Sequence, residues 1–254
     1  SLPRAEVIDL PPLGALDSAL WDALLDIADK MPSGWTLIGG QMVLLHGLEK
    51  GRVPPRVSDD LDLVVDVRVR PHVLAPMVAA LVDLGFETTG VSADGVAQRF
   101  VRGDVGVDLL APDGVGERTD LRTVGGGVTI EAAGGTFALE RSEPLDFRTG
   151  ARTGHVPRPD LAGAILIKAV AVKRDRKRGP ERHLRDLAFL LSLVNDPIAT
   201  RDLLGSRRCQ RVKAVVQLHN PGHEAWSQIE DPQARADGQA TFALIAAGPS
   251  RRAI

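Results

Sequence analysis

Apolar residues recur at three- and four-residue steps near the start of the chain, which predicts a helix over residues 16–31. The short apolar run 35–38 then predicts a buried strand, and a glycine pair leads from it into a second helical pattern over residues 41–48. After a polar, proline-containing loop, the β-branched run 61–67 predicts another strand. This alternation favours an α/β arrangement in the first half of the chain.

The same pattern continues for about seventy further residues. A helix is expected over residues 72–84, followed by two strands over residues 97–101 and 105–110. The turn residues 102–104 lie between these strands, which predicts a hairpin. The following segment is rich in Gly and Asp, and we expect only one strand in it, over residues 128–131.

Beyond residues 157–160 the hydrophobic period becomes helical and stays helical. The pattern predicts four helices, over residues 161–172, 183–194, 207–219 and 232–247. We therefore expect an α+β fold, in which a small mixed sheet with flanking helices occupies residues 1–156 and a C-terminal helical bundle occupies residues 157–254.

The composition of the 254 residues, with 44% hydrophobic and 25% charged, is that of a globular protein. Cys209 is the only cysteine, so the chain supplies neither an internal disulfide nor a zinc site made of several thiolates. No window approaches twenty consecutive apolar residues, and the first thirty residues are acidic where a secretion signal would be basic and apolar. We expect no membrane partner and a cytoplasmic location.

Charge is distributed unevenly between the two halves. Residues 1–150 hold 13 Lys and Arg against 23 Asp and Glu, whereas residues 151–254 hold 18 against 10. An enzyme that acts on a polyanion could use the basic half to bind it and the acidic half to bind metal ions. Two differently charged surfaces without such a role are the alternative.

Carboxylates occur on two of the predicted strands. Asp60 and Asp62 project from the same face of their strand, because side chains alternate with a period of two. Two such oxygen ligands suit Mg²⁺, with Mn²⁺ as a possible substitute, and Asp108 on the later strand is a candidate third carboxylate. The alternatives are a solvated strand end for the pair and a core salt bridge for Asp108.

The runs LIGGQMVLLHG and RVSDDLDLVV together resemble the nucleotidyltransferase superfamily of DNA polymerase beta type, and more narrowly its AbiEii branch, which includes the mycobacterial MenT toxins. The resemblance implies a nucleotidyltransferase core in which Gly39 and Gly40 hold the triphosphate, Ser58 lies beside it, and Asp60 and Asp62 hold metal ions. Taken alone, the glycine pair predicts only a turn, and Ser58 could cap a local turn.

A second block carries the resemblance further. Lys168 lies in the apolar helix pattern LAGAILIKAVAV, and Arg185-Asp186 lies in the next one, ERHLRDLAFLL. By the resemblance, Lys168 binds nucleotide phosphate and Asp186 completes the site. The alternatives are a Lys168 side chain that extends from a packed helix to solvent, and a pair between Asp186 and Arg182 on one helix.

A basic run separates these two helices and is a candidate nucleic-acid contact. It contains Lys173, Arg174, Arg176, Lys177 and Arg178. The chain has no Tyr and only 4% aromatic residues, so any grip on RNA would be directed chiefly at phosphates. A solvated loop is the alternative.

Together these features predict a Mg²⁺-dependent nucleotidyltransferase that transfers NMP from an NTP to a hydroxyl acceptor and releases pyrophosphate. The resemblance further implies RNA as the acceptor, such as the tRNA 3′ end, and a toxin held in check by an antitoxin protein. One alternative is an enzyme that modifies a drug or a protein. Another is a catalytically degenerate module that binds nucleotide or RNA.

Overall fold

The computed structural model describes residues 7–11, 15–56, 58–68, 73–117, 119–174 and 179–249. It divides the chain into two compact units, each built from two stretches of sequence. The first unit consists of Ser1–Met42 and Ser58–Pro159, and the second consists of Val43–Val57 and Asp160–Ile254. The second unit therefore includes a short segment from the N-terminal half of the sequence.

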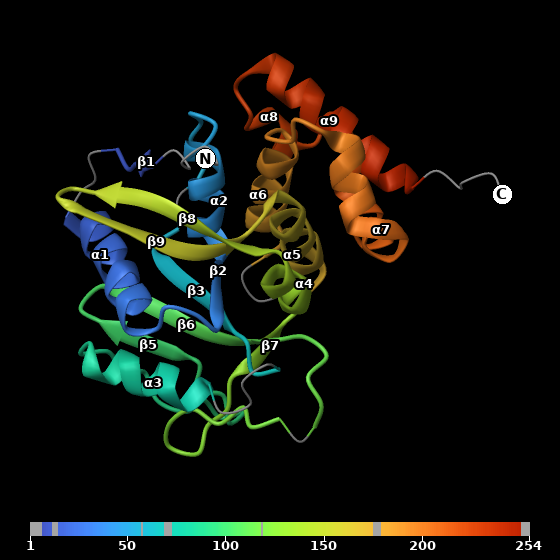
Figure 1. Cartoon of the computed structure of the whole chain (residues 1–254). Coiled ribbons are helices and arrows are strands. Elements are labelled where there is room, and N and C mark those ends of the chain that lie inside the picture. The colour runs from blue at the N-terminus through green and yellow to red at the C-terminus, as the bar shows by residue number, and fades with distance from the viewer. Residues whose placement is uncertain are drawn as a thin grey trace, which may run out of the picture. The chain divides into compact units, whose positions relative to one another are not determined.

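A six-stranded mixed sheet forms the centre of the first unit (Figure 1). Its order is β2-β3-β6-β5-β4, with β7 paired to β6. The strands β3 and β6 run parallel to each other, whereas β2 is antiparallel to β3 and β5 is antiparallel to β6. The bounds are β2 (Trp35–Ile38), β3 (Asp60–Val65), β4 (Glu87–Thr88), β5 (Arg99–Arg102), β6 (Val105–Pro112) and β7 (Ile130–Ala132). The mixed sheet and the flanking helices confirm the α+β class.

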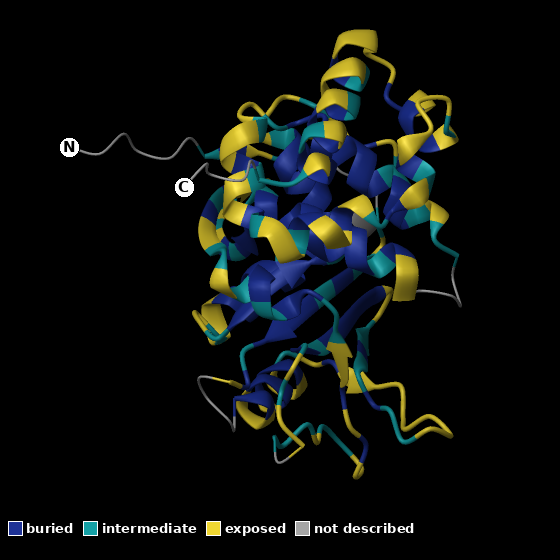
Figure 2. Ribbon diagram, turned by 90° about the vertical axis from the view of Figure 1, so that its right-hand side faces the viewer, coloured by how far each residue is buried: buried dark blue, intermediate teal, exposed yellow. Residues whose placement is uncertain are grey.

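The central strands are buried because their side chains are apolar on both faces away from the strand ends. Leu61, Leu63 and Val65 of β3 have no exposed surface, and β6 is buried along nearly all of its length. Figure 2 shows these strands mostly in the buried class, with exposed residues on the outer turns of the helices. The predicted hairpin of β5 and β6 forms, but its turn is one residue shorter than expected, because Arg102 belongs to β5 and pairs with Val105.

A second, three-stranded sheet has the order β1-β8-β9. It contains β1 (Ile8–Asp9), β8 (Ser142–Thr149) and β9 (Arg152–Pro159). The sequence pattern did not predict the β8–β9 hairpin. Leu145 and Phe147 of β8 alternate as in a half-buried strand, but prolines interrupt both strands.

Helices of the first unit pack against these sheets. They are α1 (Ala15–Lys30), α3 (Leu74–Asp83), α4 (Gly135–Glu140) and the first turn of α2 (Gly39–Leu48). Trp21 of α1 is buried and meets the ring of Phe147 edge-on, with 5.3 Å between ring centroids. Gly135 of α4 lies against Val64, which shares a face of β3 with Asp60 and Asp62.

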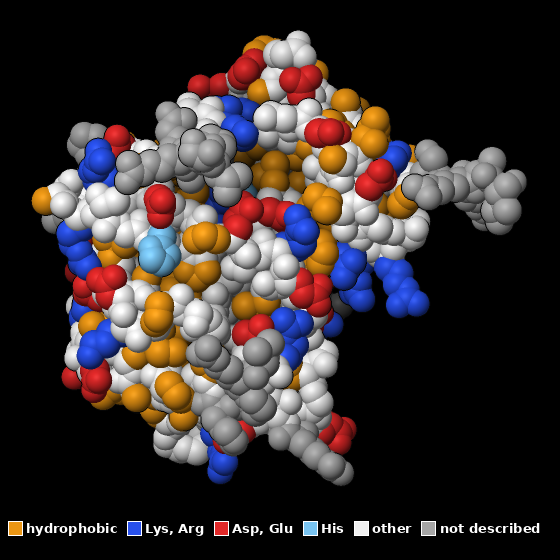
Figure 3. Space-filling model, in the orientation of Figure 1, with side chains coloured by type: hydrophobic (Ala, Val, Ile, Leu, Met, Phe, Trp, Pro, Cys, Tyr) orange, Lys and Arg blue, Asp and Glu red, His pale blue; other side chains and the backbone are white. Residues whose placement is uncertain are grey.

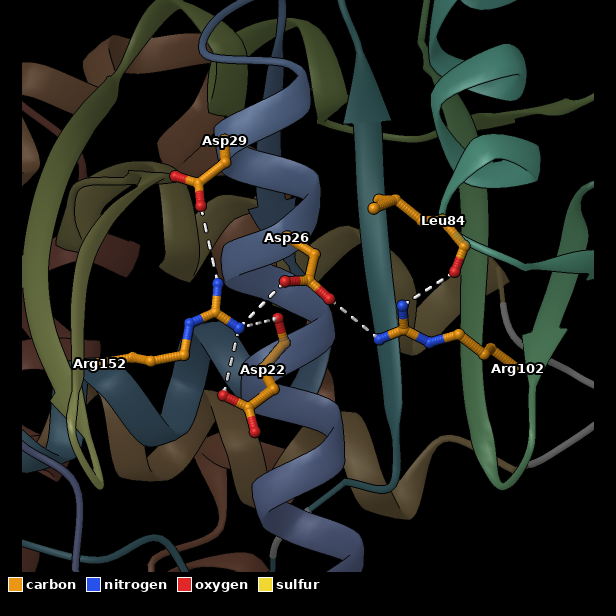
Figure 4. Close-up of polar contacts among 6 residues, drawn as sticks. All are labelled: Asp22, Asp26, Asp29, Leu84, Arg102 and Arg152. Carbon is orange, nitrogen blue, oxygen red and sulfur yellow. Dashed lines mark hydrogen bonds and ion pairs between the residues drawn. The ribbon is translucent and has the colours of Figure 1, made fainter.

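An ion-pair network fixes α1 to both hairpins of the first unit (Figure 4). Asp26 accepts from Arg152 of β9 at 3.0 Å and from Arg102 of β5 at 3.3 Å. Arg152 also lies 3.3 Å from Asp22 and 3.6 Å from Asp29. Asp26 is therefore the carboxylate shared by the two arginines.

The second unit is helical. It contains α5 (Leu161–Arg174), α6 (Glu181–Leu191), α7 (Pro197–Lys213), the 3-10 turn η1 (Val216–His219), α8 (Glu224–Ser227) and α9 (Pro232–Ala247). The prediction of one helix over residues 207–219 was wrong, since α7 begins ten residues earlier with Asp196 as its N-cap and breaks at Gly205, where φ is 67°. Within the described residues, no helix has the length and apolar character that a bilayer-spanning segment needs.

The segment 43–57 is fixed to α6 inside the second unit. The Arg52 guanidinium donates to the carbonyl and hydroxyl oxygens of Ser192, at 3.1 and 3.0 Å, and lies over the Phe189 ring. Gly47 also lies against this ring, where a larger residue would collide. These contacts explain why the segment belongs with the C-terminal helices.

Candidate active site

The glycine turn between β2 and α2 packs directly on the acidic strand. Gly39 has φ of +76°, a conformation that favours glycine, and a Cβ at this position would overlap the carboxylate of Asp62. A Cβ on Gly40 would overlap the side chain of Ser58. This close packing follows from the pairing of Ile38 with Asp62 in the antiparallel ladder of β2 and β3.

The segment before β3 is held to α2 by a side chain that sequence analysis did not single out. The Gln41 amide, which is almost fully buried, donates to the backbone carbonyl of Ser58. This contact fixes Ser58 beside the glycine turn. The structure thus brings Gly39, Gly40, Ser58 and Asp62 together.

The parallel pairing of β3 and β6 brings the predicted carboxylates together. Asp62 lies opposite Asp108 in this register, and Asp60 lies opposite Gly106. Asp60 and Asp62 are partly exposed, whereas only 6% of Asp108 is exposed. Because registered neighbours on parallel strands share a face, the three carboxylates lie on one face of the sheet.

Arg99 of β5 compensates two of these charges. Its Nη2 lies 2.6 Å from Oδ1 of Asp60, and its Nη1 lies 3.3 Å from Oδ2 of Asp108. The hydrogen bond to Asp60 is the largest cause of a raised pKa of Arg99, while burial acts in the opposite direction. The cation beside Asp60 and Asp108 is therefore permanent.

Sequence analysis missed Arg99, because the turn expected over residues 102–104 sets Gln98, and not Arg99, opposite Asp108. With Arg102 opposite Val105 across the turn, counting back three pairs places Arg99 opposite Asp108. Gly106 lies against both Arg99 and Asp60, and a Cβ there would overlap both side chains. The absence of a side chain at Gly106 is thus what allows the ion pair to cross β6.

The donor set of Asp60 and Asp62 suits a magnesium ion that shares its ligands with a nucleotide. Mg²⁺ commonly takes one or two carboxylates and completes its shell with water and phosphate oxygens. A larger protein cage is not available: within the described residues, no three His, Cys, Asp or Glu side chains are grouped to hold a metal ion. Asp60 and Asp62 could therefore supply two ligands of such an ion, with the remaining positions left to water and substrate oxygens.

The remaining predicted residues lie in the second unit. Lys168 Nζ of α5 donates to Oδ2 of Asp186 of α6 at 2.7 Å, and both side chains are buried. Nη1 of Arg56 lies 3.6 Å from the same oxygen. Lys168 does not extend to solvent, and the described partners of Asp186 lie on other elements than its own helix.

The basic run falls partly outside the described residues. Lys173 and Arg174 are exposed in the last turn of α5. Arg176, Lys177 and Arg178 lie outside the described residues.

Two solved structures resemble this chain at low identity. One is the antibiotic-resistance factor ANT(2'')-Ia in solution, with 15% identity, a TM-score of 0.41, and coverage of 71% of this chain and 85% of that chain. The other is an antigenic nucleotidyltransferase-like protein from Paracoccidioides brasiliensis, with 15% identity, a TM-score of 0.43, and coverage of 95% and 97%. No protein-family model matches the chain, and no curated protein matches it significantly.

Proposed function

We propose that the chain is a Mg²⁺-dependent nucleotidyltransferase that takes an NTP, transfers NMP to a hydroxyl and releases pyrophosphate. The observation that carries this proposal is the packing of Gly39 and Gly40 directly against Asp62 and Ser58. This packing places the first backbone amides of a helix beside carboxylates on the adjacent strand.

Different residues of the chain would bind the phosphates and the metal ion. The backbone amides at Gly39 and Gly40, together with the Ser58 hydroxyl, would donate to phosphate oxygens. Asp60 and Asp62 would hold Mg²⁺, or Mn²⁺ in its place. When bound, the metal ion would offset the charge of the triphosphate and favour an in-line approach to the α-phosphorus.

The reaction itself forms one bond and breaks one. The acceptor hydroxyl oxygen bonds to the α-phosphorus, and the bond from that phosphorus to the bridging oxygen of pyrophosphate breaks. The hydroxyl proton would pass to Asp108, whose carboxylate is oriented by Arg99 at 3.3 Å. Arg99 is thus a positioning residue in this proposal.

RNA is the acceptor we propose, with the tRNA 3′ end as the first candidate, and the biological role would be that of a toxin paired with an antitoxin. What supports the acceptor is the excess of basic residues in the C-terminal part of the sequence. The toxin role rests on the sequence resemblance alone.

A labelling experiment tests the reaction. The protein is incubated with each of the four α-³²P-labelled NTPs, Mg²⁺ and total RNA, and labelled RNA is the expected product. Asp62→Ala should abolish the product, whereas Asp59→Ala, which removes an exposed carboxylate from the same run, should leave it unchanged. Absence of labelled product with every NTP and with Mn²⁺ would refute the proposal.

The contact between Arg99 and Asp60 favours a second candidate, a nucleotide-binding module without turnover. An arginine that already compensates Asp60 and Asp108 reduces their need for a metal ion. NTP binding that depends on Gly39 but is unaffected by Mg²⁺, with no transfer to any acceptor, would select this candidate.

A further inference from the structure

A groove of about 440 Å³ lies between α5 and α7, inside the second unit. The buried residues Ala169 and Val170 form its floor, and the exposed side chains of Lys173, Arg207 and Arg211 line its sides. In the space-filling view, Lys and Arg side chains gather beside α7 (Figure 3). Among the described residues, no Asp or Glu lines the groove.

Lys173, Arg207 and Arg211 bring three positive charges to this groove. Within the described part of the chain, none of them makes an ion pair, although Arg185 pairs with Glu224 and Arg201 pairs with Asp202 in the same unit. Cations of this kind, brought together around one cavity, repel one another unless an anion is bound.

Helix stability does not explain Arg207. It lies in the first turn after the break at Gly205, where the helix dipole disfavours a positive side chain. Arg211 follows four residues later on the same face, so the two guanidinium groups are neighbours of like charge. Both features weaken α7 by themselves, and both favour an anionic ligand in the groove.

We propose that this groove binds backbone phosphates of a nucleic-acid strand, as a docking site for the RNA acceptor. The inference rests on the proposed function and deepens it, because it names a surface that would hold the acceptor. Long, exposed cations around an open groove suit a flexible phosphate backbone, and the apolar floor lacks the aromatic rings that base recognition would use.

Binding without NTP provides the test. Fluorescein-labelled tRNA transcript is titrated with the full chain and followed by anisotropy at several NaCl concentrations. Arg207→Gln and Arg211→Gln should each weaken tRNA binding about fivefold near physiological salt. Each should also make the negative slope of the log association constant against log salt concentration less steep, by about 0.7–0.9. Lys213→Gln is the matched control, since it removes an exposed cation of α7 that does not line the groove.

The outcomes separate this inference from the proposed reaction. Equal losses of tRNA affinity in Arg207→Gln, Arg211→Gln and Lys213→Gln would show unspecific charge attraction. That result would contradict the groove as the binding site. If ATP or inorganic phosphate displaced the labelled tRNA at the same concentration as unlabelled tRNA does, the groove would not be specific for a nucleic-acid strand. A wild type that binds tRNA through the groove without transferring NMP would support the groove and contradict the reaction. Thermal unfolding of each variant checks that the fold is intact.

Discussion

Arg99 holds Asp60 across the strand that separates them, with 2.6 Å between Nη2 and Oδ1. The two residues lie on β5 and β3, and the contact passes over Gly106 of β6. Its second nitrogen reaches Asp108, so one guanidinium links three strands of the sheet. One guanidinium therefore offsets part of the negative charge of Asp60, Asp62 and Asp108 before any substrate binds.

Replacing Arg99 by Gln should destabilise the protein by about 1–2 kcal/mol, because Asp60 and Asp108 lose a shared cation and repel each other. Urea unfolding measures the change. Addition of millimolar Mg²⁺ should recover part of the loss in the variant and have a smaller effect on the wild type. Arg122→Gln, which removes an exposed pair with Asp120, is the control and should change neither value. A variant as stable as the wild type would contradict the role of Arg99.

Gly39→Ala should destabilise the protein by about 2 kcal/mol or more, since it adds both an unfavourable positive φ and an overlap with Asp62. Gly51→Ala separates the two causes, because Gly51 has φ of +63° but no atom near the added Cβ. We expect about 1 kcal/mol for that control. Urea unfolding, together with NTP binding by calorimetry, checks both variants. If Gly39→Ala and Gly51→Ala lost the same free energy of unfolding, the close contact with Asp62 would add nothing to the cost of the substitution.

Lys168→Met should cost about 3–5 kcal/mol, because it leaves the buried carboxylate of Asp186 with the more distant Arg56 as its remaining cation among the described residues. The double variant Lys168→Met/Asp186→Leu should recover most of this loss, as an apolar pair replaces an ionic one. Chemical unfolding of the two single variants and the double variant gives the coupling energy. The same proteins, tested for NMP transfer, show whether the ion pair has a role beyond stability. A double variant that transfers NMP normally would remove both residues from the mechanism.

Asp26→Ala should lower stability by about 1 kcal/mol, since it removes the carboxylate shared by Arg102 and Arg152 and leaves Arg152 only its contacts with Asp22 and Asp29 among the described carboxylates of α1. The loss should shrink in 1 M NaCl, where the pairs are screened. Asp29→Ala is a suitable comparison, because Asp29 is 79% exposed and lies 3.6 Å from Arg152. Thermal unfolding at low and high salt measures the stability of both variants. An effect of Asp26→Ala that does not depend on salt would point to packing as the cause.

Local patterns predicted the parts of the site that depend on neighbouring residues. The strand before Gly39, the alternation of Asp60 and Asp62, and the turn between β5 and β6 are all set by a few adjacent positions, and the structure has each of them. The contact of Arg99 with Asp108 depends on the register of the hairpin, which a local motif does not specify. The buried pair of Lys168 and Asp186 depends on the packing of α5 on α6, and the sequence left its partners open.

The failures have physical causes as well. The β8–β9 hairpin contains prolines in both strands, and these interrupt its strand pattern. The start of α7 was missed despite Asp196 and Pro197, which are an N-cap and a first-turn proline. Gly205 interrupts that helix and hid its apolar periodicity.

The attachment of residues 43–57 to α6 has a consequence for the order of folding during synthesis. Arg52 leaves the ribosome 140 residues before Ser192, its hydrogen-bond partner. At ordinary translation speeds this delay is about 10 s or more. The helical unit cannot finish assembling until both pieces have emerged, so a fragment that starts at Asp160 would lack the arginine that covers Phe189.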